Sequence, residues 1–171
     1  MSMRLVRGVY LADGVHVIGE VTIGAETSIW FGSVVRGDTA PVRIGRRVNV
    51  QDNCTIHTDD DVPNVIGDRV TFAHGVIAHG AEVGDGSLIG IGARLLAGSR
   101  IGKNCLVAAG AVVPPNLVVP DGMVVMGLPG RVVRETNDRE KAYLAMVPDR
   151  YLGLAKLHHE HPEDPRARRF E

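Results

Sequence analysis

The chain has few aromatic residues and almost no net charge. Aromatic residues make up 4% of its 171 residues, and the formal net charge is −1 at pH 7. A chain without a basic excess gives no electrostatic reason to expect nucleic acid or an anionic membrane as a partner. Gly and charged residues interrupt every apolar stretch, which argues against a transmembrane helix. The N-terminal segment does not read as a signal peptide, so we expect a cytoplasmic protein.

In contrast, aliphatic residues recur every six positions from residue 11 to residue 125. Internal periodicity of this kind is the signature of repeat architectures. The step is six except at three places, where residues 35–44 and 56–66 carry extra residues and 78–83 is one short. The repeated positions are Leu11, Val17, Ile23, Ile29, Val35, Ile44, Val50, Ile56, Ile66, Phe72, Ala78, Val83, Ile89, Leu95, Ile101, Val107, Val113, Val119 and Val125.

A period of six suits a short strand followed by a turn and does not suit a helix with 3.6 residues per turn. Such units bury their apolar side only by stacking on one another. The pattern resembles the hexapeptide-repeat proteins, in which three hexads form one coil. This resemblance implies an all-β fold, a left-handed parallel β-helix of hexapeptide repeats with a C-terminal α-helix. Cys54 and Cys105 occupy small inward positions of their hexads, so we expect them to be buried free thiols.

The end of the chain predicts a helix. Asn137 followed by Glu140 has the pattern of a capping box, and an apolar stripe at helical spacing follows it. Pro148 interrupts the stripe, so we expect a kink or two helical pieces. Three histidines near this end (His158, His159 and His161) are expected to be exposed. We therefore divide the chain into a β-helix domain (1–132), a C-terminal helix (133–160) and a flexible tail (161–171).

Three histidines in the middle of the repeat are the candidate metal ligands. His57 and His79 each follow the aliphatic residue of their hexads, one coil apart, and so stand at equivalent corners. Adjacent strands lie about 4.8 Å apart, which allows two such imidazoles to share one ion. His74 belongs to a hexad on another side of the triangle, so we expect it to reach such a pair only on a neighbouring subunit. These positions predict a homotrimer with three sites, each shared between two chains.

Three imidazoles leave one coordination position of zinc open for water, which is the arrangement of a catalytic site. Water bound there has a pKa near 7 and supplies hydroxide at neutral pH. The simplest reaction for such a group is attack on a small electrophile such as CO2. Imidazoles also accept iron and cobalt, so Fe or Co is possible in place of Zn.

The segments VVRGD, NVQDNCTIHT and FAHGVIAHG resemble the hallmarks of gamma-class carbonic anhydrases. The resemblance implies reversible hydration of CO2 to bicarbonate by a metal-bound hydroxide at trimer interfaces, with the three histidines as ligands. It also assigns the remaining site residues. Arg36 and Asp38 form ion pairs between subunits, with Asp52 nearby; Asn49 and Gln51 line the site; and Tyr151 reaches it from the helix.

The chain departs from that family where active members carry glutamates that export protons. Thr39 stands at one such position, and the loop that would carry the other reads Asp59, Asp60, Asp61. A poor proton relay limits turnover even when the metal geometry is right, so a family member with weak or no hydratase activity stays an alternative. So does a hexapeptide acyltransferase dependent on acyl-CoA, since the fold alone does not decide function. A module that keeps zinc for structure and a metal-dependent hydrolase also stay open.

Overall fold

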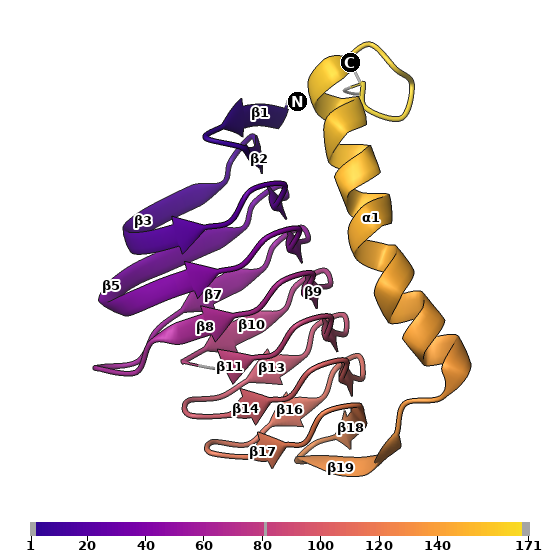
Figure 1. The fold of residues 1–171 in the computed structure, drawn as a ribbon. Coiled ribbons are helices and arrows are strands. Elements are labelled where there is room, and N and C mark those ends of the chain that lie inside the picture. Colours follow the sequence, from indigo (N-terminus) through magenta and orange to yellow (C-terminus); the bar gives the residue numbers. More distant parts are fainter. Residues whose placement is uncertain (1–2, 81, 169–171) are drawn as a thin grey trace.

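The computed structural model describes residues 3–80 and 82–168. Figure 1 shows a stack of coils built from short strands, with one long helix running along the side of the stack. The first part of the chain forms β1 (Met3–Val6), β2 (Val9–Ala12), β3 (His16–Ile23), β4 (Ser28–Ile29), β5 (Val34–Ile44), β6 (Asn49–Val50), β7 (Thr55–His57), β8 (Asn64–Ile66), β9 (Thr71–Phe72) and β10 (Ile77–His79). The rest forms β11 (Glu82–Val83), β12 (Leu88–Ile89), β13 (Arg94–Leu95), β14 (Arg100–Ile101), β15 (Leu106–Val107), β16 (Val112–Val113), β17 (Val118–Val119), β18 (Met123–Gly127), β19 (Gly130–Glu135) and α1 (Asp138–Glu160).

The strands stack in the register that the six-residue period predicts. On one face, Leu11 pairs with Ile29, Ile29 with Val50, and Val50 with Phe72. The same ladder continues through β12, β15 and β18, all in parallel. The other two faces are joined through β5, with β7, β10, β13 and β16 on one side and β8, β11, β14 and β17 on the other. The predicted left-handed parallel β-helix with a C-terminal helix is confirmed.

The expectation of one short strand per hexad is wrong near the N-terminal end. There β3 and β5 run on for 8 and 11 residues and each joins two faces of the coil. The first part of β5 pairs with β7 and its last part with β8, so the strand bends around the corner without a turn. The residues that break the period between Val35 and Ile44 are absorbed by this long strand.

The core is a narrow column of stacked aliphatic side chains, with small polar residues and both cysteines among them. Ser33 shows how these polar groups are satisfied: its hydroxyl donates to the carbonyl of Gln51 at 2.7 Å and accepts from the N–H of Cys54 at 3.0 Å. Both cysteines are buried and free, as expected, and burial raises the pKa of the Cys54 thiol to about 12. Ser87 is satisfied in the same way, since its hydroxyl donates to the carbonyl of Gly102 and accepts from the N–H of Cys105.

Several corners need Gly because successive coils touch there. A Cβ on Gly84 would lie 2.7 Å from the backbone carbon of Gly102, and a Cβ on Gly24 would lie 2.6 Å from that of Gly45. No side chain fits between backbones at this separation. The glycines after the aliphatic residue therefore allow close stacking of the coils.

The C-terminal helix begins with the predicted capping box. The Asn137 side chain accepts from the N–H of Glu140, and the Glu140 carboxylate accepts from the N–H of Asn137. The helix is continuous from Asp138 to Glu160 and contains Pro148, so two separate pieces are not formed. The boundary at 132/133 is displaced, because residues 133–135 still belong to β19, which pairs with β18.

Helix α1 packs along one face of the coil through apolar contacts and an ion pair. Leu152 and Ala155 pack with Tyr10 and Trp30, and Leu144 and Val147 pack with Leu88. Among the described helices, none is long and apolar enough to cross a membrane. Within the predicted tail, residues 161–168 form turns in which Ala167 is buried, and residues 169–171 lie outside the described part.

The ion pair joins Asp149 of the helix to Arg69 at a corner of the coil. The two side chains form two hydrogen bonds, of 3.1 and 3.0 Å. Arg69 also donates to the carbonyl of Ala145 at 2.9 Å. This two-point contact fixes the middle of the helix against the coil.

Candidate metal centre and adjoining pocket

Two of the three candidate ligands lie side by side on one face of the coil. Strands β7 and β10 are parallel neighbours, and their register pairs His57 directly with His79. The ring centroids are 5.3 Å apart, with an angle of 35° between the ring planes. The predicted equivalence of these two corners is therefore a property of the fold.

The third histidine lies on another face. His74 follows β9, which belongs to the other sheet, and its side chain is 47% exposed. Within the described residues, no group of three His, Cys, Asp or Glu side chains is placed to hold a metal ion. His74 and the His57–His79 pair thus point from different sides of one chain.

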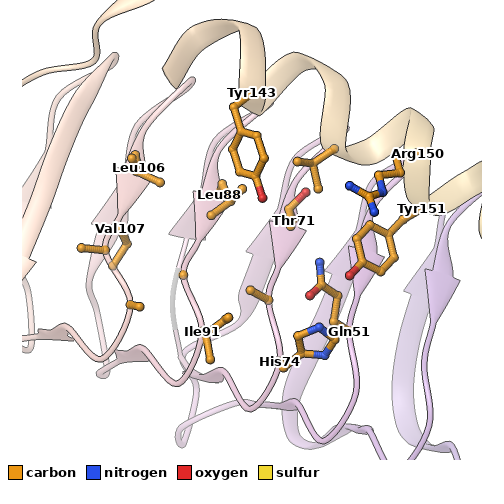
Figure 2. Close-up of a pocket in the computed structure, with 15 residues that line it drawn as sticks. Gln51, Thr71, His74, Leu88, Ile91, Leu106, Val107, Tyr143, Arg150 and Tyr151 are labelled. Atoms are coloured by element: carbon orange, nitrogen blue, oxygen red, sulfur yellow. The ribbon is translucent and has the colours of Figure 1, made fainter. Parts of the chain in front are cut away.

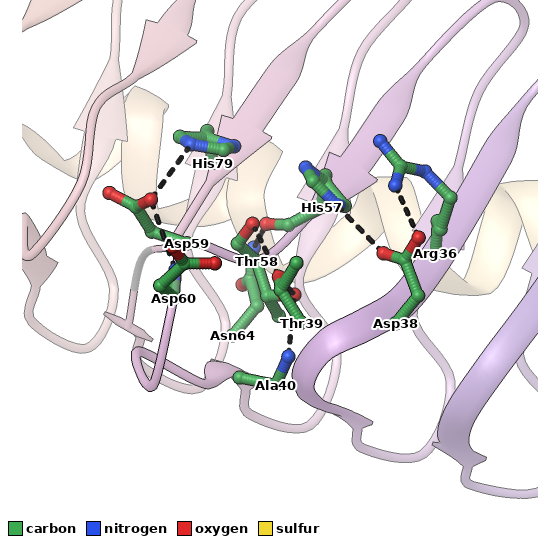
Figure 3. A network of polar contacts seen from close by, with 10 residues as sticks. All are labelled: Arg36, Asp38, Thr39, Ala40, His57, Thr58, Asp59, Asp60, Asn64 and His79. Atoms are coloured by element: carbon green, nitrogen blue, oxygen red, sulfur yellow. Dashed lines mark hydrogen bonds and ion pairs between the residues drawn. The ribbon is translucent and has the colours of Figure 1, made fainter.

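Each of the three imidazoles has a carboxylate at one ring nitrogen. The Nε2 atom of His57 lies 3.0 Å from Asp38, and the Nδ1 atom of His74 lies 2.9 Å from Asp52. The third contact is longer, since His79 Nε2 lies 4.0 Å from Asp59. Figure 3 shows the first and third of these contacts along one edge of the coil.

The second ring nitrogen of each histidine has no protein partner among the described residues. A carboxylate on one nitrogen fixes the ring and its tautomer and leaves the other nitrogen as a lone-pair donor, as in most metal-bound histidines. The donor set therefore fits a metal of the zinc, iron or cobalt type.

Arg36 and Asp38 form a pair within one chain, at 2.5 Å. Their side chains are 40% and 42% exposed. The Arg36 guanidinium, and after it His57, hold the pKa of Asp38 below its usual range, so this carboxylate stays charged. Asp52 contacts His74 and so supports the third candidate ligand. Whether Arg36 and Asp38 also pair across an interface stays a prediction.

A hydrogen-bonded support behind the pair was not foreseen from the sequence. The buried Asn64 side chain donates to the carbonyls of His57 at 3.0 Å and Ala78 at 3.1 Å, so one amide ties the two coils together next to both histidines. Thr58 adds a contact with Thr39, with their hydroxyl oxygens 2.8 Å apart. The only sequence signal for this role was a polar side chain, Asn64, shortly before the aliphatic Ile66 of its hexad.

The predicted catalytic residues gather beside His74. Gln51, His74 and Tyr151 line a pocket of 420 Å³ between the coil and helix α1, as Figure 2 shows. Gln51 donates through Nε2 to the side-chain oxygen of Asn49 at 3.1 Å, and Asn49 in turn donates to Thr71 at 2.8 Å. This chain of hydrogen bonds fixes the Gln51 amide, leaving its oxygen as the acceptor that can face the pocket.

Tyr151 is held against the coil by its ring. It meets Trp30 edge to face at a centroid distance of 5.5 Å. Burial, and after it the Asp52 carboxylate, raises the pKa of its phenol, so the hydroxyl remains a donor at neutral pH. Asn49 does not line the pocket and acts on it through Gln51. The structure thus brings Gln51 and Tyr151 to one pocket and Asn49 behind it, while their catalytic roles stay a prediction.

The expectation of exposed histidines near the C-terminus is wrong for His158. Its ring meets Trp30 and Phe31 at centroid distances of 5.3 and 6.1 Å. Burial lowers the pKa of this imidazole, so it is neutral at physiological pH. His159 and His161 are exposed. The helical spacing from Tyr151 to His158, seven residues, was the signal that both rings face the coil.

Residues 80–115 match the bacterial transferase hexapeptide (six repeats) family. A protein from Methanocaldococcus jannaschii described as a probable carbonic anhydrase is 45% identical over 150 residues, which cover 88% of this chain and 94% of the relative. Gamma carbonic anhydrase 2, mitochondrial, from Arabidopsis thaliana is 37% identical over 89% of this chain and 57% of its own length. The chain belongs to the gamma-class carbonic anhydrase-like family of hexapeptide-repeat proteins.

A solved structure adds a second description on the same fold. The crystal structure of a putative acetyltransferase from Bacillus cereus is 35% identical, covers 88% of each chain and has a TM-score of 0.86. Membership of the gamma-class family therefore fixes the architecture, while the chemistry has to be argued from the site residues.

Proposed function

We propose that this protein is a metal-dependent enzyme that interconverts CO2 and bicarbonate at sites shared between the subunits of a homotrimer. In this proposal His57 and His79 of one subunit and His74 of the next hold one ion, with zinc as the first choice and iron or cobalt as alternatives. The observation that carries the proposal is the directly paired His57 and His79, together with a third, carboxylate-supported imidazole on another face.

Bound by three imidazoles, zinc supplies hydroxide at neutral pH because it lowers the pKa of water to about 7. The protein's own groups account for the remaining requirements. The Gln51 amide oxygen would be the group that accepts a hydrogen bond from the nucleophile, because the amide nitrogen is engaged by Asn49. The Tyr151 hydroxyl is a neutral donor for a substrate oxygen.

The pocket also suits the substrate. CO2 is apolar, and Leu88, Leu106 and Val107 of the coil give the pocket an apolar wall. Bicarbonate is a polar anion, and the donors of the helix lie on the opposite side of the same pocket. For proton export, Asp59 is 50% exposed and lies 4.0 Å from His79, so it connects this edge of the coil to solvent. The proposed compartment is the cytoplasm, whose reducing conditions are compatible with the two free cysteines.

Stopped-flow CO2 hydration by the purified protein, loaded separately with zinc and anaerobically with iron(II), tests this function. We expect hydration to be lost in His74→Ala and kept in the matched control His16→Ala, which changes an exposed histidine elsewhere on the coil. Absence of hydration in both metal forms, with about one ion bound per chain, would overturn the hydratase and leave the metal site standing.

The alternative is acyl transfer, favoured by the structural likeness to the putative acetyltransferase. That reaction needs one histidine as base and no metal. Acetylation of an acceptor from acetyl-CoA by metal-free protein, lost in only one of the three histidine variants, would favour it. Loss of activity in all three variants, together with loss of metal, would support the hydratase.

A further inference from the structure

Arg150 is a permanent cation on the wall of the pocket beside Gln51 and His74. Figure 2 shows its side chain leaving helix α1 close to Tyr151. It is exposed, and no carboxylate among the described residues pairs with it. No Asp or Glu lines this pocket. The Asp52 carboxylate lies next to the pocket, 2.9 Å from His74 Nδ1, but it forms no ion pair with Arg150. Among the described residues, Arg150 is therefore an unpaired cation on the pocket wall.

The neighbouring acid is engaged elsewhere. Asp149 precedes Arg150 on the helix, yet it is bound by Arg69 through two hydrogen bonds and lies 3.7 Å from Arg47. The two guanidinium groups and this carboxylate lie outside the pocket, at the corner of the coil. Asp149 thus binds at the corner of the coil, while the adjacent Arg150 lies beside the cavity.

Two further donors lie on the same side of the pocket. Tyr143 and Tyr151 stand seven residues before and one residue after Arg150 on the helix, and all three line the cavity. Neither phenol has a hydrogen-bond partner among the described residues. Arginine and hydroxyl donors together are the groups that bind a carboxylate.

The opposite wall is apolar. Leu88 lies in β12 with Ile91 just after it, and Leu106 and Val107 lie in β15, its neighbour on the next coil. The cavity therefore extends along the coil away from His74. Ile91 is 58% exposed, so part of this wall faces the open side of the cavity. At roughly 30 Å³ per water, the cavity has room for about a dozen waters, far more than one bicarbonate ion requires.

We propose that this pocket binds a monocarboxylate with a short apolar body, with the carboxylate on Arg150 and Tyr151 and the body along the Leu88–Val107 wall. The pocket is the one that the proposed function gives to CO2 and bicarbonate, and the assignment goes beyond that function by naming a larger ligand for the apolar part of the cavity. It requires no bound metal. It is therefore tested on protein freed of metal, so that its outcome is separate from that of the hydratase.

The test is calorimetric titration of the intact metal-free protein with formate, acetate, butyrate and hexanoate in a low-chloride buffer. We expect the affinity to rise about three- to fourfold for each methylene that enters the pocket. Arg150→Gln should weaken hexanoate binding roughly 10- to 100-fold, because a charge-assisted contact is lost. Arg139→Gln on the same helix, away from the pocket, is the matched control and should leave the affinity unchanged.

A second variant tests the apolar wall. Ile91→Ser changes an exposed residue and should flatten the dependence on chain length without changing the affinity for acetate. Hexanol serves as the uncharged probe and should bind Arg150→Gln as it binds the unchanged protein. The proposal is overturned if hexanoate does not bind, if Arg150→Gln binds it as tightly as the Arg139→Gln control, or if the four carboxylates bind alike.

Discussion

His57 and His79 are direct partners in the ladder between β7 and β10, and their rings lie 5.3 Å apart. They are 22 residues apart in sequence, because the loop after His57 adds four residues to a coil of eighteen. The buried Asn64 amide bonds to the carbonyls of His57 and Ala78, which holds the two coils at this spacing. The pair is thus fixed by backbone register, while His74 belongs to another face.

A shared site makes a specific prediction about mixed trimers. His57→Ala and His74→Ala should each reduce bound metal to near zero, although the residues lie on different faces. When the two variant chains are mixed during assembly, about a quarter of the interfaces should combine an intact pair with an intact His74. Metal analysis of the mixture should therefore recover about a quarter of the metal content of the unchanged protein.

A different outcome would exclude the shared site. If His74→Ala alone keeps full metal content, His74 is not a ligand. If the mixture recovers no metal although mass spectrometry shows mixed trimers, then all ligands come from one chain. His16→Ala should behave as the unchanged protein in each experiment.

The carboxylates beside the histidines predict a graded effect on metal affinity. Asp52→Asn removes the charge 2.9 Å from His74 Nδ1 and should weaken metal binding roughly 10- to 100-fold, because the ring loses its fixed tautomer. Asp60→Asn, an exposed change in the nearby loop, should have no effect. Competition with a chromophoric chelator measures both affinities. Equal affinities in the two variants would show that Asp52 does not support a ligand.

The sequence predicted the architecture because the repeat is nearly one-dimensional. Each aliphatic position, such as Ile56 and Ala78, fixes the neighbour above and below it, so counting residues gave the observed register. The same counting placed His57 beside His79. The capping box at Asn137 was predictable because it depends on residues three apart in the chain.

The pocket was harder to predict, because it depends on where the helix lies on the coil. The contact between Arg69 and Asp149 spans 80 residues, and no local pattern indicates it. Arg150 follows Tyr143 by seven residues and so lies on the same helix face. That Arg150 is free to bind a ligand could not be predicted, because it depends on the binding of Asp149 to Arg69. Asn64 was missed for the same reason, since its two partners come from different coils.

The burial of both cysteines predicts that the native protein does not react with thiol reagents. Burial raises the pKa of Cys54 to about 12 and also raises that of Cys105, so at pH 8 only about one Cys54 in ten thousand is a thiolate. Ellman's reagent should therefore find no reactive thiol in native protein and both after unfolding in urea. Fast reaction of the native protein would contradict the burial of both side chains.

The N-terminus of α1 predicts how stability depends on pH. Arg134, and after it the N–H of Asn137, lower the pKa of Glu140 to about 2. Because the pKa of Glu140 is lower in the folded than in the unfolded protein, its ionised carboxylate stabilises the fold at pH values above the unfolded pKa near 4.5. This stabilisation is lost as the pH falls towards 2. Glu140→Gln keeps a capping oxygen but loses the ion pair, at a cost of roughly 1 kcal/mol or less, since Arg134 is 44% exposed.

Urea unfolding at several pH values checks this dependence. The difference in the free energy of unfolding between the unchanged protein and Glu140→Gln should be constant above about pH 5 and should disappear by about pH 2. Glu135→Gln, at an exposed acid one residue beyond Arg134, is the control and should not show this closure. A gap that persists at pH 2 would mean that Glu140 acts through packing and not through its charge.

Two glycine-to-alanine changes should alter stability in opposite directions. On the coil, a Cβ at Gly84 would lie 2.7 Å from the backbone of Gly102 and Lys103, which can yield only if neighbouring coils separate. We expect Gly84→Ala to cost about 1–3 kcal/mol. On the helix, no atom lies within 4 Å of a Cβ at Gly153, and alanine should add roughly 0.5–1 kcal/mol by restricting the unfolded chain. Unfolding curves at one fixed protein concentration compare them, because the stability of an oligomer depends on concentration. If Gly84→Ala were neutral, the coils would be able to part at this corner, and the register that brings His57 to His79 would not be held by backbone contact.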